Sequence, residues 1–191
     1  MCIQYQLACL MILFLNFMPT PTFAEERHWS FSLVRAAQVR GGLKNTLTDH
    51  WPAYISFLRA AKEFAGSRDG LAWEVEGQLV KHLGLQHHWE TNGLVVARWH
   101  PFPWDRYLDT SFAIGEGLSY ATDVPEVEVA RGKDTARLLN YLLFELTFAL
   151  PKYPNVQLVT LMHHRSGAYG LFSGVVGGSN FFGSGIKYMF M

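Results

Sequence analysis

Apolar and polar residues alternate with a period of two along much of the chain. In the stretch 71–79, LAWEVEGQL, mainly apolar side chains at the odd positions alternate with two glutamates and a glutamine at even positions. Successive side chains of a strand point to opposite faces, so this stretch has one apolar face and one polar face. A helix would scatter both sets around its axis. The pattern predicts a β-strand.

The same test predicts eight strands. In 110–120 every second residue is small, which suits the crowded interior of a small barrel. The stretch 52–64, PAYISFLRAAKEF, also fits an amphipathic helix. No internal repeat or domain linker separates the segments. The predicted strands cover residues 28–38, 52–64, 71–83, 88–99, 108–120, 138–150, 156–169 and 179–190.

The first residues are typical of an export signal. Residues 9–18, CLMILFLNFM, form an apolar run that is too short to span a bilayer and is followed by PTPTFA. We expect residues 1–24 to be a signal peptide cleaved after Ala24, and residues 25–191 to form one barrel domain. A buried N-terminal helix or a retained anchor is the alternative. Both cysteines, Cys2 and Cys9, lie in this segment, so the mature chain is expected to lack disulfides.

Composition narrows the class of partner. The 191 residues include 16 basic and 16 acidic side chains, so no bulk charge favours nucleic acid. Aromatic residues make up 15% of the chain and charged residues only 17%, which is unusual for a soluble domain. In KHLGLQHHWE, the spacing of His82, His87 and His88 matches no metal-site template, and we expect these side chains in a solvent-exposed loop. No cofactor and no metal are predicted.

Together these patterns predict an eight-stranded antiparallel up-and-down transmembrane β-barrel in the bacterial cell outer membrane. Closure removes the sheet edges, whose unpaired backbone groups would be costly in a bilayer. Close to the end of the sequence, GIKYMF at 185–190 places Ile186, Tyr188 and Phe190 on one face, as in the last strand of bacterial outer-membrane proteins. A soluble periplasmic barrel with its apolar faces inward is the alternative.

Two further sets of side chains have expected places in such a barrel. The acidic and amide residues of the third and sixth strands should form an interior network with basic partners, because narrow barrels fill their lumens with such groups. Several tryptophans near strand ends should form an aromatic girdle at the membrane surface. The expected network contains Glu74, Glu76, Gln78 and Glu145 with partners such as Arg98 or Lys187, and the girdle contains Trp89, Trp99 and Trp104.

A polar patch interrupts the apolar pattern in LMHHRSGAYGLF, residues 161–172. On a strand, His164 and Ser166 share one face, with Cα atoms roughly 7 Å apart for the ~3.3 Å rise per residue. His163 and Arg165 lie on the opposite face, where structural or substrate-orienting roles are expected. This arrangement predicts that the two polar pairs serve different purposes.

Register arithmetic brings other polar residues beside this patch. Pairing across the short turn after residue 150 places Asn140 opposite Ser166. If residues 120 and 138 are level, Glu116 also lies in the same region. We expect Glu116, Asn140, His164 and Ser166 to form a polar cluster on the outer wall, although a slip of one residue would reverse the faces.

Such a cluster suits nucleophilic catalysis on a lipid ester. Serine is a weak nucleophile until a base removes its proton, and the histidine needs a third group to fix its tautomer. His164 and Ser166 are the candidate dyad, and Glu116 is the candidate third member. Backbone N–H groups of the GVVGGSN link, or the Arg165 guanidinium, are candidate oxyanion donors.

About the last thirty residues resemble the lipid A 3-O-deacylases, also described as acyloxyacyl hydrolase-like proteins. The resemblance rests on HRSG at 164–167, GGSNFFGSGIKY at 177–188 and the terminal Phe190. It implies an eight-stranded outer-membrane barrel in which His164 is the general base and Ser166 the nucleophile. The implied reaction releases an ester-linked acyl chain from lipid A of lipopolysaccharide, with the membrane and its lipid as the partners and no nucleic acid.

Two positions depart from that family's pattern. Gly167 follows the serine where the family has asparagine, and no aspartate or glutamate occurs after Ser166, where the family has its acid. Three interpretations stay open. Glu116 or Glu145 supplies the acid from another strand, Asn180 orients the histidine, or the chain is a non-catalytic outer-membrane barrel with a structural or ligand-binding role.

Overall fold

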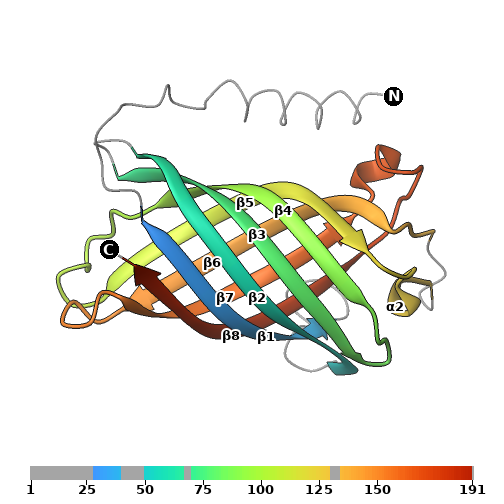
Figure 1. Cartoon of the computed structure of the whole chain (residues 1–191), viewed down its shortest axis with the longest axis horizontal. Coiled ribbons are helices and arrows are strands. Elements are labelled where there is room, and N and C mark those ends of the chain that lie inside the picture. The colour runs from blue at the N-terminus through green and yellow to red at the C-terminus, as the bar shows by residue number, and fades with distance from the viewer. Residues whose placement is uncertain (1–27, 40–49, 67–69, 130–133, 191) are drawn as a thin grey trace.

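The period-two pattern forms eight antiparallel strands that close on themselves in sequence order (Figure 1). The computed structural model describes residues 28–39, 50–66, 70–129 and 134–190. The predicted signal peptide and its cleavage site lie outside these residues. The strands are β1 (Trp29–Val39), β2 (His50–Gly66), β3 (Leu71–Gly84), β4 (Trp89–Trp99), β5 (Asp109–Ala121), β6 (Leu138–Ala149), β7 (Val156–Ser166) and β8 (Gly178–Phe190).

The predicted fold is confirmed, and the predicted strands lie within two residues of the observed ones except at the end of β7. The ambiguous stretch 52–64 is part of β2 and is not a helix. Ile55 and Phe57, at odd positions of β2, are fully buried, whereas Leu58 is exposed on the other face. No helix among the described residues has the length and apolar character needed to cross a bilayer.

Closure brings the first and last strands together. The ladder between β1 and β8 runs from Trp29 paired with Phe190 to Gln38 paired with Phe181. A side chain at Gly185 would collide with the backbone of β1 at Leu33, so a glycine lets these strands approach. Every described strand is therefore hydrogen-bonded on both sides, as a bilayer requires.

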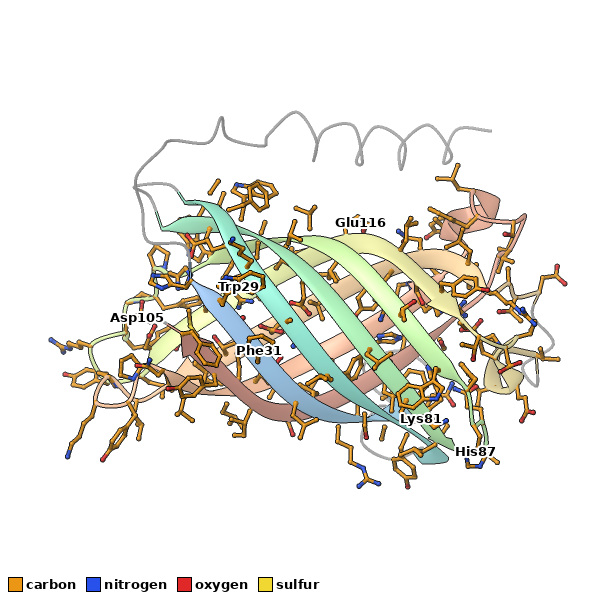
Figure 2. All side chains as sticks on the ribbon, viewed as in Figure 1. Trp29, Phe31, Lys81, His87, Asp105 and Glu116 are labelled. Carbon is orange, nitrogen blue, oxygen red and sulfur yellow. The ribbon has the colours of Figure 1, made fainter. Side chains whose placement is uncertain are left out.

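Each of the eight strands exposes large apolar side chains on the outer wall. Leu33, Leu58, Val75 and Ile186, from four different strands, each expose more than half of their surface. Aromatic residues flank this band at the end that carries Trp29 and Phe190, which we call the terminal end, and Trp89 lies at the opposite, far end. Figure 2 shows Trp29 and Phe31 near the terminal end. Such an exposed apolar band is the outer surface of a transmembrane barrel and does not fit the soluble alternative, whose apolar side chains would face only inward.

Charged side chains occupy part of the lumen, beside an apolar cluster that includes Phe57 and Leu143, and the predicted interior network is confirmed. Arg98 Nε lies 2.6 Å from Glu74 Oε1, and Arg59 Nε lies 2.6 Å from Glu76 Oε1. Glu145 contacts both arginines. The attraction within these pairs and their hydrogen bonds offset the desolvation penalty of the buried charges. Within this network three cations, Arg59, Arg98 and Lys187, face three carboxylates, Glu74, Glu76 and Glu145.

The far end of the lumen is covered by α2 (Glu126–Val129), which follows β5 (Figure 1). Glu128 of this short helix is buried and pairs with Arg165, at 3.1 Å, and accepts a hydrogen bond from Ser179 at 2.7 Å. Val127 is buried in the apolar part of the core. The helix therefore caps the lumen and neutralises a cation inside it.

Candidate active site on the outer wall

Alternation along β7 separates the polar patch into two pairs, as predicted. His163 and Arg165 are buried in the lumen, at 0% and 1% exposure, whereas His164 and Ser166 are partly exposed on the outer wall. The pairing of β6 with β7 sets Asn140 opposite Ser166, which confirms the predicted register. The candidate dyad therefore lies on the membrane side of the barrel, close to the far end.

His164 is held by an amide from the neighbouring strand. It is paired with Asn180 of β8, and its Nδ1 lies 2.5 Å from Asn180 Oδ1. Because a carbonyl oxygen only accepts hydrogen bonds, this contact assigns the proton to Nδ1 and leaves the lone pair on Nε2. That is the tautomer a general base needs.

Glu116 lies on the same wall but contacts a different residue. Its carboxylate accepts a hydrogen bond from the Asn140 side-chain amide, which also donates to the Gly117 carbonyl at 3.3 Å. Figure 2 shows Glu116 on the outer side of β5. Within the described ranges, the only side-chain hydrogen bond of His164 is the one with Asn180. The catalytic role of Glu116 therefore stays a prediction. No side-chain hydrogen bond between Glu116 and His164 supports it.

Ser166 is the last residue of β7 and is partly exposed. It pairs with Asn140 on one side and with Gly178 on the other. Its hydroxyl makes no side-chain hydrogen bond to any residue that the structure describes. The separation of residues i and i+2 on a strand, roughly 7 Å between Cα atoms, lets side-chain tilt bring the hydroxyl toward the imidazole.

β7 ends at Ser166, three residues earlier than predicted, because the chain turns sharply after the serine. Gly167 begins a link that contains the 3-10 helix η2 (Ala168–Gly170), and Ala168 and Tyr169 adopt positive φ angles of 46° and 56°. A side chain on residue 167 would collide with the Val175 carbonyl. The returning link therefore explains why glycine stands here instead of the asparagine of the resembling family.

Arg165 does not face the outer site, and its proposed role as an oxyanion donor is wrong. Its guanidinium pairs with Glu128 and donates to Ser119 Oγ at 2.9 Å and to the backbone carbonyl of Ala136 at 2.7 Å. All three partners lie inside the barrel or at its cap. The alternation of β7 makes this residue structural. The backbone N–H groups of the link between β7 and β8 are then the remaining candidate donors to the oxyanion, and this role stays a prediction.

The expectation of three loop histidines is also wrong. His87 lies in the far-end turn (Figure 2) and is exposed, but His82 and His88 are buried in the lumen at 2% and 4% exposure. Burial, with the neighbouring His82 next in effect, lowers the pKa of His88 to about 4. Continuing the alternation of β3 and β4 to the turn would have placed both residues inside.

Glu145, the other acid considered for the triad, is on the opposite side of the wall from the dyad. It is buried at 1% exposure and is bound by Arg59 and Arg98 in the lumen. It therefore cannot orient His164. Among the sequence candidates, Asn180 is the residue that contacts the base.

Comparisons with solved structures concern the fold. Neisserial surface protein A (NspA) is 12% identical to this chain, with a TM-score of 0.53, and the match covers 87% of this chain and 100% of that one. A second match is Ail, the attachment invasion locus protein of Yersinia pestis, solved in complex with the heparin analogue sucrose octasulfate. Ail is 13% identical to this chain with a TM-score of 0.32, and the match covers 85% of this chain and 97% of that one. No family model and no curated protein matches the chain. The likeness to NspA and the apolar outer wall make this chain an outer-membrane type of eight-stranded β-barrel, in agreement with the predicted localisation.

Proposed function

We propose that the chain is an outer-membrane esterase that releases an ester-linked acyl chain from lipid A. One observation carries the proposal: on the membrane-facing wall, two residues from Ser166, His164 Nδ1 is hydrogen-bonded to Asn180. The bond favours the tautomer with a free lone pair on Nε2, which is the atom that must take the serine proton.

In this mechanism Ser166 Oγ attacks the carbonyl carbon of the ester while its proton passes to His164 Nε2. The imidazolium then protonates the leaving alkoxide, and an acyl-serine remains. A water molecule then attacks the acyl-serine carbonyl while its proton passes to His164 Nε2. The imidazolium returns that proton to Ser166 Oγ as the C–O bond to serine breaks and the fatty acid leaves. Asn180 holds the ring throughout, as the asparagine does in Cys-His-Asn proteases.

The location of the cluster supports a lipid substrate. A serine on the lipid-exposed side of a barrel meets esters of membrane lipids without extracting them from the bilayer. With the terminal end toward the periplasm, the far end lies in the outer leaflet, where lipid A resides. The resemblance of HRSG and GGSNFFGSGIKY to the lipid A 3-O-deacylases gives the same substrate class.

The test compares lipid A from bacteria that express the parent chain, Ser166→Ala or His164→Ala. Mass spectrometry should show loss of one acyl chain with the parent and no loss with either variant. Thr160→Ala is the matched control, because it removes a hydroxyl from the same outward face of β7 away from the cluster. Circular dichroism and the migration of unheated protein in gels establish that each barrel is folded.

If folded Ser166→Ala and His164→Ala change lipid A as the parent does, the assigned residues are wrong. If the folded parent leaves lipid A unchanged both in cells and in mixed micelles, the esterase proposal fails. That second result would favour the other candidate.

The other candidate is a non-catalytic outer-membrane barrel with a structural or ligand-binding role. A specific observation favours it: the Glu116 carboxylate is bound by Asn140, so His164 has a neutral amide in place of an acid. A neutral partner stabilises an imidazolium less than a carboxylate does. Under this interpretation the cluster would serve to satisfy polar groups near the rim.

A further inference from the structure

The far half of the lumen contains a cluster of nitrogen and oxygen ligands that the proposed reaction does not use. It comprises His82 at the end of β3, His88 in the following turn, Glu90 of β4 and His163 of β7, and we call it the luminal histidine cluster. Its members are between 0% and 4% exposed. The ligand atoms of His82, His88 and Glu90 lie within 4.8 Å of one another.

The fourth member approaches from across the barrel. His163 Nε2 lies 3.4 Å from Glu90 Oε1 without the geometry of a hydrogen bond. That separation is close to the ~3.3 Å between neighbouring donors of a tetrahedral site with bonds of about 2.0–2.1 Å. The Glu90 carboxylate therefore lies between the imidazoles of His163 and His82. His82 Nε2 is 2.8 Å from Glu90 Oε2.

Several of these nitrogen and oxygen atoms have no hydrogen-bond partner among the described residues. Among the described residues, His88 Nε2, Glu90 Oε1 and both ring nitrogens of His163 are buried without a hydrogen bond. Buried polar atoms are nearly always satisfied, and four orphaned atoms at one place require an explanation. Their chemistry, imidazole nitrogen with carboxylate oxygen, is the donor set of zinc sites.

The surroundings suit a bound ion as well. The side-chain amide of Gln86 donates to His82 Nδ1 at 2.6 Å and holds that ring in place. Ligation of an ion by His82 Nε2 requires this amide to turn, so that its oxygen accepts a hydrogen bond from Nδ1–H. The ring of His163 packs against Phe57, Tyr141 and Phe181, with centroids 5.4, 4.7 and 5.7 Å away, which limits access of water.

We propose that the luminal histidine cluster binds one zinc ion through His82, His88, Glu90 and His163. Binding replaces the hydrogen bond between His82 and Glu90 with bonds to the metal. It also turns the rings of His82 and His88, which are stacked at 4.0 Å, toward a common centre. The ion would join β3, β4 and β7 across the lumen, directly behind the outer-wall histidine.

The test uses the folded full-length chain in detergent micelles, stripped with a chelator and titrated with Zn²⁺ and Co²⁺. We expect about one equivalent of either ion to bind, with the visible absorption of tetrahedral Co²⁺ for the second. His88→Gln and Glu90→Gln should each weaken binding by more than the ~10–100-fold typical for loss of an outer-sphere partner. His87→Gln is the matched control, because it changes the adjacent exposed histidine (Figure 2) and should leave the affinity unchanged.

The proposal fails if the folded parent binds neither ion at micromolar concentration, a measurement that needs no variant. It also fails if His87→Gln removes binding as fully as His88→Gln, or if binding persists in both His88→Gln and Glu90→Gln. Parent binding with an octahedral cobalt spectrum would likewise contradict the four-ligand site. None of these measurements depends on lipid A hydrolysis, so this inference and the proposed esterase are tested separately.

Discussion

The two faces of β7 carry the same kinds of residue in different surroundings. Inside, Arg165 is buried and has side-chain and backbone partners from three segments of the chain, in β5, in α2 and just before β6. Outside, His164 has one side-chain partner and Ser166 has none among the described residues. A strand that alternates in this way places its stabilising contacts on one side and leaves the other side available for chemistry.

The largest expected effect is a loss of stability. It is tested by comparing one substitution inside the barrel with one on the outer wall. Glu145→Gln keeps the shape of the side chain but leaves Arg59 and Arg98 with unbalanced buried charge, which should cost about 3–5 kcal/mol of unfolding free energy. Glu116→Gln, on the outer wall, should cost less than about 1 kcal/mol. Urea unfolding in lipid vesicles measures both values. Equal losses would contradict the division of roles between the faces.

A second, smaller effect concerns the border between the outer site and the far-end link. Gly167→Ala introduces a side chain where the Val175 carbonyl lies, so it should destabilise the barrel by about 1–3 kcal/mol. It should also reduce acyl release, because Ser166 directly precedes the link. Gly77→Ala, at a strand position with open space around it, is the control and should be close to neutral. A neutral Gly167→Ala would mean that the link is free to move away from the serine.

The smallest expected effect compares the partners of the inner and outer histidines. His82 has the carboxylate of Glu90, whereas His164 has the amide of Asn180. Asn180→Asp should raise the rate of acyl release about fivefold, since a charged hydrogen bond stabilises imidazolium by roughly 1 kcal/mol more than a neutral one. Asn180→Ala should lower the rate. Assays of purified protein in lipid A micelles would show this, and equal losses in both variants would argue against an orienting role.

Much of the outer site was predictable from local pattern. Alternation assigns His164 and Ser166 to one face, and the short turn between β6 and β7 fixes the pairing of Asn140 with Ser166. The contact between His164 and Asn180 required more, because it depends on the register of β7 with β8. A link of eleven residues, 167–177, separates those strands, and its length alone does not determine which residues face each other.

The sequence predicts a charged network in the interior but does not identify all of its residues. The carboxylates of β3 and β6 pointed inward as alternation required, yet Arg59 went unassigned because β2 also fitted a helix. His82 and His88 were expected in solvent because their spacing fits no metal-site template and they lie at a turn between two predicted strands. In a barrel with tilted strands, the lumen extends to the last residues of each strand, so side chains close to a turn remain enclosed.

The pairing of β1 with β8 has a consequence for how the chain folds. Its two ends must meet before either terminal strand is protected, and contacts between residues so far apart in sequence form slowly. Until then, both strands expose hydrogen-bonding edges that other chains can occupy. β1 has no partner on that side until Gly185 and its neighbours on β8, the eighth strand of the barrel, pair with it. The chain therefore stays prone to aggregation until this last pairing forms.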